Sequence, residues 1–337
     1  MISKLDAIKR ALKSLPLNKQ DEVYRHIQSI ISANDRDIAA CPFCGVMDDY
    51  VKYGHKDGKQ RYKCKSCLKI FTERTGTALA YSQSTNAEWE TVIIHTLQGK
   101  VLRETSELLD IPIERIWRMR HIIMRLIEDY VEKSDSKLLG DVEVDDTYFQ
   151  LSVKGTKNID EETYGRPARL HGAKSRTRGV SNELASVNVG IARNGDSYSR
   201  SVNTGKPSYN DVMTVFSHRI NGDADVYCDG DKSFMKAFNK IATVHRVEKF
   251  SKTAHMSTVN NFHSQLKQQI ERVYKGVATK YLNRYCAMLA LGYRQTNNMD
   301  EVIDLVHGLL FEPRHNRVKA AQLKTHNILD LGQLANL

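Results

Sequence analysis

The sequence lacks any apolar run as long as a membrane-spanning helix needs, which is about 18 residues or more. Its first residues, MISKLDAIKRALKSL, have helical spacing but no apolar core of the kind that a secretory signal contains. Internal repeats and low-complexity tracts are also missing. These absences exclude integral membrane proteins and repeat arrays, and we expect a soluble, cytoplasmic protein with no membrane partner.

Length and charge set the next bounds. The chain has 337 residues, far more than one typical domain, so we expect two or more units. Lys and Arg total 50 against 40 Asp and Glu, which gives a net charge of +10. A basic balance favours a polyanionic partner such as nucleic acid, although charge alone is weak evidence.

Four of the six cysteines form two Cys-x-x-Cys pairs, namely Cys41 with Cys44 and Cys64 with Cys67. Two residues between paired cysteines let a tight turn direct both thiolates at one tetrahedral ion, and the 19 residues from 45 to 63 can form a returning hairpin. This spacing predicts a zinc ribbon with a structural Zn²⁺. Buried or disulfide-linked cysteines are the alternative, but no secretory context favours disulfides.

Periodicity and breaks divide the chain into five predicted segments. They are a helical hairpin over 1–35, the zinc ribbon over 36–75, a helix-turn-helix unit over 84–135, an α/β domain over 138–297 and a helical C-terminal tail over 298–337. The pattern assigns no role to the tail.

The predicted helix-turn-helix unit begins with a capped helix from Asn86 to about Gly99, followed by a short helix, a break at 110–112 and a longer helix. In the first half of the longer helix Arg115, Arg118, Arg120 and Arg125 outnumber the single acid Glu114, and we take Arg115 and Arg118 as DNA-binding candidates. An apolar stripe, Ile116, Met119, Ile123 and Leu126, is expected to be buried. An ordinary helical bundle with a solvated basic face remains the alternative.

Residues 138–297 have the pattern of one mixed sheet covered by helices. Three meandering strands are followed by a helix, a strand at 224–229, a helix, a strand at 243–247 and a long helix from about Thr258 to Tyr274. This order is found in ribonuclease H-like folds. The predicted fold class is therefore α/β, a ribonuclease H-like mixed sheet with flanking helices, preceded by a zinc ribbon and a helix-turn-helix unit.

Two aspartates end predicted strands. Asp145 lies toward the end of the first strand, on the face opposite Val142 and Val144, and Asp229 ends the fourth strand. Ligands of open α/β sheets gather at strand ends, so the two carboxylates could share a metal that Asn260, in the first turn of the long helix, could also reach. Aspartates that cap turns and an asparagine that caps a helix are the plain alternative.

Several segments resemble DDE-type insertion-sequence transposases of the ISXO-like group, whose members also carry an N-terminal zinc ribbon. These segments are VEVDDTYF, YCDGDKSF, HMSTVNNFHSQLKQQI and YLNRYCAMLALGYRQTN, together with CPFCG and YKCKSC. The resemblance covers most of the chain. It departs from the family motif at Asn260, where glutamate is usual, at Ser257, where asparagine is usual, and at His263, where tryptophan is usual.

The resemblance implies a catalytic set of Asp145, Asp229 and Asn260 that holds Mg²⁺ or Mn²⁺. Transposases with asparagine at the third position and lysine seven residues on form a subgroup, and Lys267 has that place here. Lys267 would contact DNA phosphate, and Arg294 matches a further basic position of the family. The basic insertion over 152–182, which includes Arg176 and Arg178, would bind the DNA backbone, with a solvated loop as the alternative.

The sequence therefore predicts a transposase that binds the terminal inverted repeats of an insertion sequence and cuts and joins DNA strands at a metal site. We expect the protein to be associated with the nucleoid. We also expect it to act as a homo-oligomer on the ends of the insertion sequence and on the target DNA. The alternatives are a catalytically inactive or domesticated zinc-ribbon DNA-binding protein and a plain nuclease.

Overall fold

The computed structural model describes residues 14–16, 19, 38, 40–56, 59–155, 178–242, 256–294 and 299–312. Nearly all of the helical hairpin predicted over 1–35 therefore lies outside the described residues, as do most of the basic insertion and the last part of the tail. The chain divides into two compact units, one reaching Arg120 and the other extending from His121 to Val306. No helix in the described ranges is both long and apolar enough to cross a membrane.

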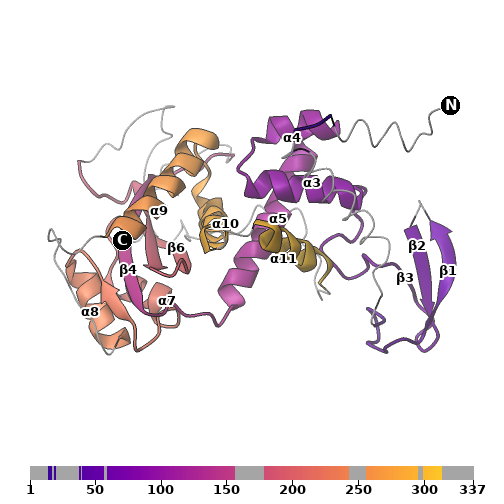
Figure 1. Ribbon diagram of the computed structural model, residues 1–337, viewed down its shortest axis with the longest axis horizontal. Helices are drawn as coiled ribbons and strands as arrows, with labels where there is room; N and C mark the ends of the chain where they lie inside the picture. Colours follow the sequence, from indigo (N-terminus) through magenta and orange to yellow (C-terminus); the bar gives the residue numbers. More distant parts are fainter. Residues whose placement is uncertain are drawn as a thin grey trace, which may run out of the picture. The chain divides into compact units, whose positions relative to one another are not determined.

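The first unit begins with a small antiparallel sheet in the order β1-β2-β3 (Figure 1). Its strands are β1 (Tyr50–Lys56), β2 (Lys59–Cys64) and β3 (Ile70–Phe71). The rings of Tyr50, Tyr62 and Phe71 pack together on one face, with centroids 5.4–5.8 Å apart. Cys41 and Cys64 are buried against this aromatic cluster. So small a sheet buries little apolar area, which is why it depends on its four cysteines.

Three helices follow in the chain, as the sequence predicted. They are α3 (Asn86–Leu97), α4 (Leu102–Leu109) and α5 (Ile113–Lys133). Thr85 and Glu88 form a reciprocal capping box that starts α3, and Asp110, with a φ of 52°, makes the turn before α5. The four apolar residues of the predicted stripe are all buried, namely Ile116, Met119, Ile123 and Leu126.

The second unit contains a four-stranded mixed sheet in the order β6-β5-β4-β7. Its strands are β4 (Asp141–Gln150), β5 (Leu184–Ala192), β6 (Ser197–Thr204) and β7 (Asp225–Tyr227). The β4–β5 and β5–β6 pairs are antiparallel and the β4–β7 pair is parallel. This confirms the predicted mixed sheet; the strand predicted at 243–247 lies outside the described residues.

Helices flank this sheet on both sides (Figure 1). They are α7 (Tyr209–Phe216), α8 (Lys232–Ile241), α9 (Ser257–Lys267) and α10 (Leu282–Arg294). The 3₁₀ turn η2 (Thr279–Tyr281) precedes α10 in the chain, and α11 (Met299–Phe311) follows it. Helices α7 and α8 share a buried core with Val142 and Val144 on one face. On this face the sheet needs a glycine at position 190, because a Cβ there would come within 2.9 Å of the Phe216 ring. On the other face Ser199 donates to the carbonyl of Cys286 in α10.

The predicted long helix from Thr258 to Tyr274 is continuous, but its last third is not α-helical. Residues Gln268–Val273 form a π-helical turn, η1. The amide of Tyr274 correspondingly donates to the carbonyl of Gln269, five residues back, at 3.0 Å. Single π-turns are rare in proteins, and those that occur are often found at functional sites.

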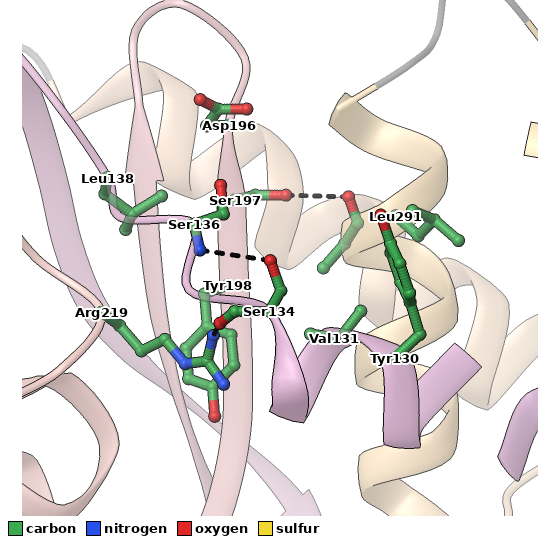
Figure 2. A pocket seen from close by; sticks show the side chains of 11 residues that line it. Tyr130, Val131, Ser134, Ser136, Leu138, Asp196, Ser197, Tyr198, Arg219 and Leu291 are labelled. Carbon is green, nitrogen blue, oxygen red and sulfur yellow. Dashed lines mark hydrogen bonds between the residues drawn. The ribbon is translucent and has the colours of Figure 1, made fainter. Parts of the chain in front are cut away.

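Arg219 fastens the segment that leads from α5 into β4. Its guanidinium donates to the carbonyls of Glu132 and Ser134, and its carbon lies 4.7 Å from the ring centre of Tyr198. Figure 2 shows Arg219, Ser134 and Tyr198 in the lining of a small pocket. Ser197, which also lines it, donates to the carbonyl of Ala290. The lining of this pocket includes none of the predicted catalytic residues.

Candidate functional site

The pairing of β4 with β7 brings the two predicted catalytic aspartates to equivalent positions. The last parallel pair joins Glu143 to Tyr227, and continuing this register by two residues on each strand places Asp145 beside Asp229. Asp145 itself lies in the middle of β4, not toward its end as predicted, because the antiparallel pairing with β5 continues to Gln150. Relative to the shorter β7, however, both aspartates lie just beyond the last pair.

Two other acidic residues, Asp146 and Asp229, act on the carboxyl group of Asp145 by their charge. Burial raises the pKa of Asp145 to about 7; a hydrogen bond from the Asp146 backbone opposes this, and the charges of Asp146 and Asp229 add to it. The positive charge of Lys267 lowers the same pKa. The side chain of Asp145 is 26% exposed. A carboxyl group that resists ionisation among other carboxylates is the environment that a bound cation would relieve.

Helix α9 turns one face toward Asp145. On this helix Nδ1 of His263 lies 3.9 Å from Oδ2 of Asp145, and the charge of Lys267 acts on the same carboxylate. Asn260 precedes His263 by three residues and Lys267 by seven, so all three lie along one helical face. The Asn260 residue is exposed to solvent. By helical spacing, Asn260 therefore shares a face of α9 with His263, the residue that lies near Asp145.

His263 is the residue of this site that sequence reasoning noticed only as a departure from a motif. It is 8% exposed, and its Nε2 has no hydrogen-bond partner within the part of the chain that the structure describes. Burial, with the charge of Lys267, lowers the pKa of His263 to about 4. The imidazole is therefore neutral at physiological pH. The sequence signal that could have identified His263 as part of the site was its spacing of three residues from Asn260, which puts both on one side of the helix.

A second acidic pair lies next to the first. Burial raises the pKa of Asp146 to about 6; the Tyr148 hydroxyl, which donates to its Oδ2 at 2.9 Å, opposes the shift, and the charges of Asp229 and Asp231 add to it. Asp231 accepts from the amide of Ser233 at the start of α8 and lies 2.5 Å from the Lys206 amine. Asp229 accepts from the Asp231 amide, so it also shapes the turn, as the plain alternative predicted.

The donor set of the aspartate site suits a hard divalent cation. Two carboxylates and one amide oxygen are ligands that Mg²⁺ and Mn²⁺ accept. The amide is neutral, so this set carries one negative charge less than a site with three acids. In donor chemistry the set suits a divalent cation, which it would bind more weakly than three carboxylates would.

The four cysteines of the ribbon come together as predicted. Their sulfur atoms all lie within 4.8 Å of one another, with 3.7 Å between Cys41 and Cys67 and 3.6 Å between Cys44 and Cys64. A tetrahedral zinc site with bonds of about 2.3 Å would separate its sulfurs by about 3.8 Å. The amide of Cys67 also donates to the sulfur of Cys64. The quartet therefore fits a structural Zn²⁺.

Each knuckle of the ribbon needs a residue with left-handed backbone directly after its second cysteine. Gly45 fills this position in the first knuckle with a φ of 74°, and Leu68 fills it in the second with a φ of 59°. Glycine adopts this region freely and leucine does not. The second knuckle thus holds a strained residue whose side chain is exposed.

The structure describes only some of the predicted DNA-binding residues. Arg115 and Arg118 are exposed in the first turns of α5, and Lys267 and Arg178 are also exposed. Arg120, which was counted with these arginines from the sequence, is buried at 2% exposure, and Arg125 pairs with Asp129 at 2.8 Å. Arg176 and the side chain of Arg294 lie outside the described part of the chain.

Comparison with known proteins gives two similarities. Residues 137–296 match the family model of the ISXO2-like transposase domain, a span that includes β4, β7 and α9. The chain is also similar to "Uncharacterized protein in transposable element ISH50" from Halobacterium salinarum. The two are 22% identical over 252 residues, which is 73% of this chain and 82% of that protein.

Proposed function

We propose that the protein is a DNA transposase of the Asp-Asp-Asn type, since its residues 137–296 match the family model of the ISXO2-like transposase domain. It binds the terminal inverted repeats of an insertion sequence and catalyses metal-dependent strand cleavage and strand transfer into target DNA. Because two ends must be cut, it acts as a homo-oligomer on DNA, in the nucleoid of the cytoplasm.

One observation carries this proposal: the parallel β4–β7 pairing ends at Glu143 and Tyr227, two residues before Asp145 and Asp229 respectively. Two carboxylates held this way beside the face of α9 that bears Asn260 form a ligand set for Mg²⁺ or Mn²⁺. The charge of Lys267 on the same carboxylate supports a place for DNA phosphate next to the ligand set. The ribonuclease H-like order of the elements agrees with this reading.

The residues have separate roles in the proposed reaction. Asp145 would contact both ions, Asp229 one of them, and Asn260 the other through its amide oxygen. When bound, a pair of divalent ions supplies activation of the attacking oxygen and stabilisation of the leaving oxygen in an in-line displacement at phosphorus. Asp145 must give up its proton to bind metal, since its pKa is raised to about 7. Lys267 would hold a phosphate of the bound strand by charge.

Binding of the DNA ends rests on the first unit and on basic residues around the catalytic domain. The zinc ribbon with its four cysteines and the helix-turn-helix unit would recognise the terminal repeats, with Arg115 and Arg118 at the start of α5. Arg176, Arg178 and Arg294 would contact the DNA backbone near the catalytic domain.

A strand-transfer assay tests the proposal. Purified protein is incubated with DNA that carries the element's own ends and a target plasmid, in Mg²⁺ or Mn²⁺. We expect cleavage at the ends and joined products for the wild type and for Asp223→Ala, which removes an exposed acid from the loop before β7. Asp145→Ala should retain end binding and lose both products.

Two other outcomes would select the alternatives. End binding without cleavage by the wild type in either metal would favour the inactive or domesticated DNA-binding protein. That reading is supported by the neutral Asn260 and by the unusual His263 and Ser257. Hydrolysis of DNA ends without joining would favour a plain nuclease.

A further inference from the structure

Glu143 is a buried acid that the proposed mechanism does not use. It lies in β4, two residues before Asp145 and on the same face of the strand, and it is 1% exposed. A buried carboxylate is costly unless charge or hydrogen bonds compensate it. The partners of Glu143 therefore identify what it does.

The first partners of Glu143 are two backbone amides at the start of α9, where amides have no acceptor within the helix. Oε2 of Glu143 accepts from the amide of Thr258 at 2.9 Å and from that of Val259 at 3.0 Å. These are the second and third residues of the helix, whose amides a side chain at the N-cap normally satisfies. The N-cap here is Met256, whose side chain makes no such bond. Glu143 thus supplies from the sheet the acceptor that the helix lacks locally.

The other oxygen of Glu143 is held by Arg193. Nε of Arg193 lies 3.3 Å from Oε1 of Glu143, and its Nη1 lies 3.0 Å from Oδ2 of Asp141. The guanidinium also stacks at 4.7 Å over the ring of Tyr227. The carboxylate of Glu143 is therefore fixed through both of its oxygen atoms. Its negative charge at the N-terminus of α9 is also stabilised by the helix dipole.

These contacts connect the two supports of the metal site. Asn260 follows Val259 directly in α9, and Asp145 stands two residues from Glu143 in β4. We propose that Glu143 is a positioning residue that sets the first turn of α9 against β4 and so sets Asn260 relative to Asp145 and Asp229. This inference rests on the proposed function, because it assigns Glu143 to the same metal site.

A buried cap that only stabilises α9 would make the same contacts, and a substitution at Met256 separates the two roles. Asp at the N-cap accepts from the same two amides. Met256→Asp in a Glu143→Gln background therefore restores the cap without restoring the tie to the sheet. Positioning predicts that this double variant regains the helix start but not the metal site.

The experiment uses the full zinc-loaded chain. Mn²⁺ binding is measured by electron paramagnetic resonance, and amide hydrogen exchange reports on residues 257–261. Glu143→Gln should speed exchange of these amides and weaken Mn²⁺ binding by about tenfold or more, a range typical of residues behind metal ligands. Glu143→Gln with Met256→Asp should recover slow exchange and keep the weak binding. The control Asp141→Asn, which removes the exposed partner of Arg193, should match the wild type in both.

Glu143→Asp gives a second variant if Glu143→Gln does not fold, because it keeps the charge but is one methylene too short to reach α9. Wild-type Mn²⁺ affinity in both Glu143 variants, or recovery of affinity in the double variant, would overturn the positioning role. A wild-type protein that bound no Mn²⁺ would refute the proposed metal site and the positioning role with it. The two failures are therefore distinguishable.

Discussion

Nδ1 of His263 lies 3.9 Å from Oδ2 of Asp145, and burial moves the pKa values of these two groups in opposite directions. The pKa of Asp145 rises to about 7 and that of His263 falls to about 4, so both groups favour their neutral forms. The contact is therefore not an ion pair in the metal-free protein. The opposite shifts give the folding stability two pH dependences of opposite sign.

Asp145→Asn should stabilise the metal-free protein at alkaline pH. The raised pKa of Asp145 favours folding below its unfolded value of about 3.9, and this stability is lost as the pH rises to about 7. Denaturant unfolding in the absence of divalent cations should show a gain of up to about 4 kcal/mol at pH 8, vanishing near pH 4. An equal effect at both pH values would contradict the raised pKa.

His263→Phe should change the pH dependence in the opposite sense. The lowered pKa of His263 gives stability that is present above about pH 6.5 and is lost as the pH falls to about 4. The variant should therefore lose less stability than the wild type on acidification from pH 7.5 to 4.5, by up to about 3 kcal/mol. The altered packing affects both pH values alike, so only the difference between them is diagnostic. Parallel curves for the two proteins would exclude this titration.

Asn260→Asp should strengthen metal binding. A carboxylate in place of the amide adds one negative charge to the donor set, and we expect about tenfold tighter Mn²⁺ binding in a calorimetric titration. Asn261→Asp is the matched control, because it adds the same charge at the next exposed position of α9. Equal affinities for both variants and the wild type would remove Asn260 from the ligand set.

Cys41→Ser should unfold the ribbon and leave the catalytic domain folded. The ribbon has few buried apolar residues besides the cysteines and their aromatic neighbours, so loss of one thiolate removes most of its stability. Zinc content should fall, specific binding to the DNA ends should weaken, and thermal unfolding of the catalytic domain should be unchanged. Collapse of the whole protein's fold would contradict the separate role of the ribbon.

Arg118→Gln should reduce the salt dependence of DNA-end binding. If Arg118 contacts a phosphate, its loss lowers the slope of log K against log salt concentration by about 1. Arg125→Gln is the control, because Arg125 is engaged by Asp129 in the same helix and is expected to leave the slope unchanged. Equal slopes for both variants would place Arg118 outside the DNA interface.

Local patterns were sufficient for the elements of the sheet and for the zinc ligands. The alternation in β4 to β6 and the Cys-x-x-Cys spacing are short-range signals, and both predictions agree with the structure. The common register of Asp145 and Asp229 depends on strand pairing between segments more than eighty residues apart, which no local pattern encodes. The hydrogen bond between Glu143 and the start of α9 joins residues that are 115 apart in the chain, so no local pattern could predict it either.

Two residues show the limit of sequence patterns at single positions. Arg120 was counted in the basic excess of α5, but it is buried, because a count of charges along a helix does not define the face on which each residue lies. Asp145 was expected near the end of its strand, since the length of β7 and that of β4 could not be compared before they were paired. Apolar spacing could not reveal the π-turn either, because the polypeptide there remains helical.

The π-turn at Gln268–Val273 has a consequence for how this chain can change in evolution. A turn of this kind holds one residue more than an α-helical turn. Loss of one residue from it would restore ordinary winding, while Asn260, His263 and Lys267 kept their common face. The segment can therefore absorb a single-residue deletion that the preceding eleven residues of α9 cannot.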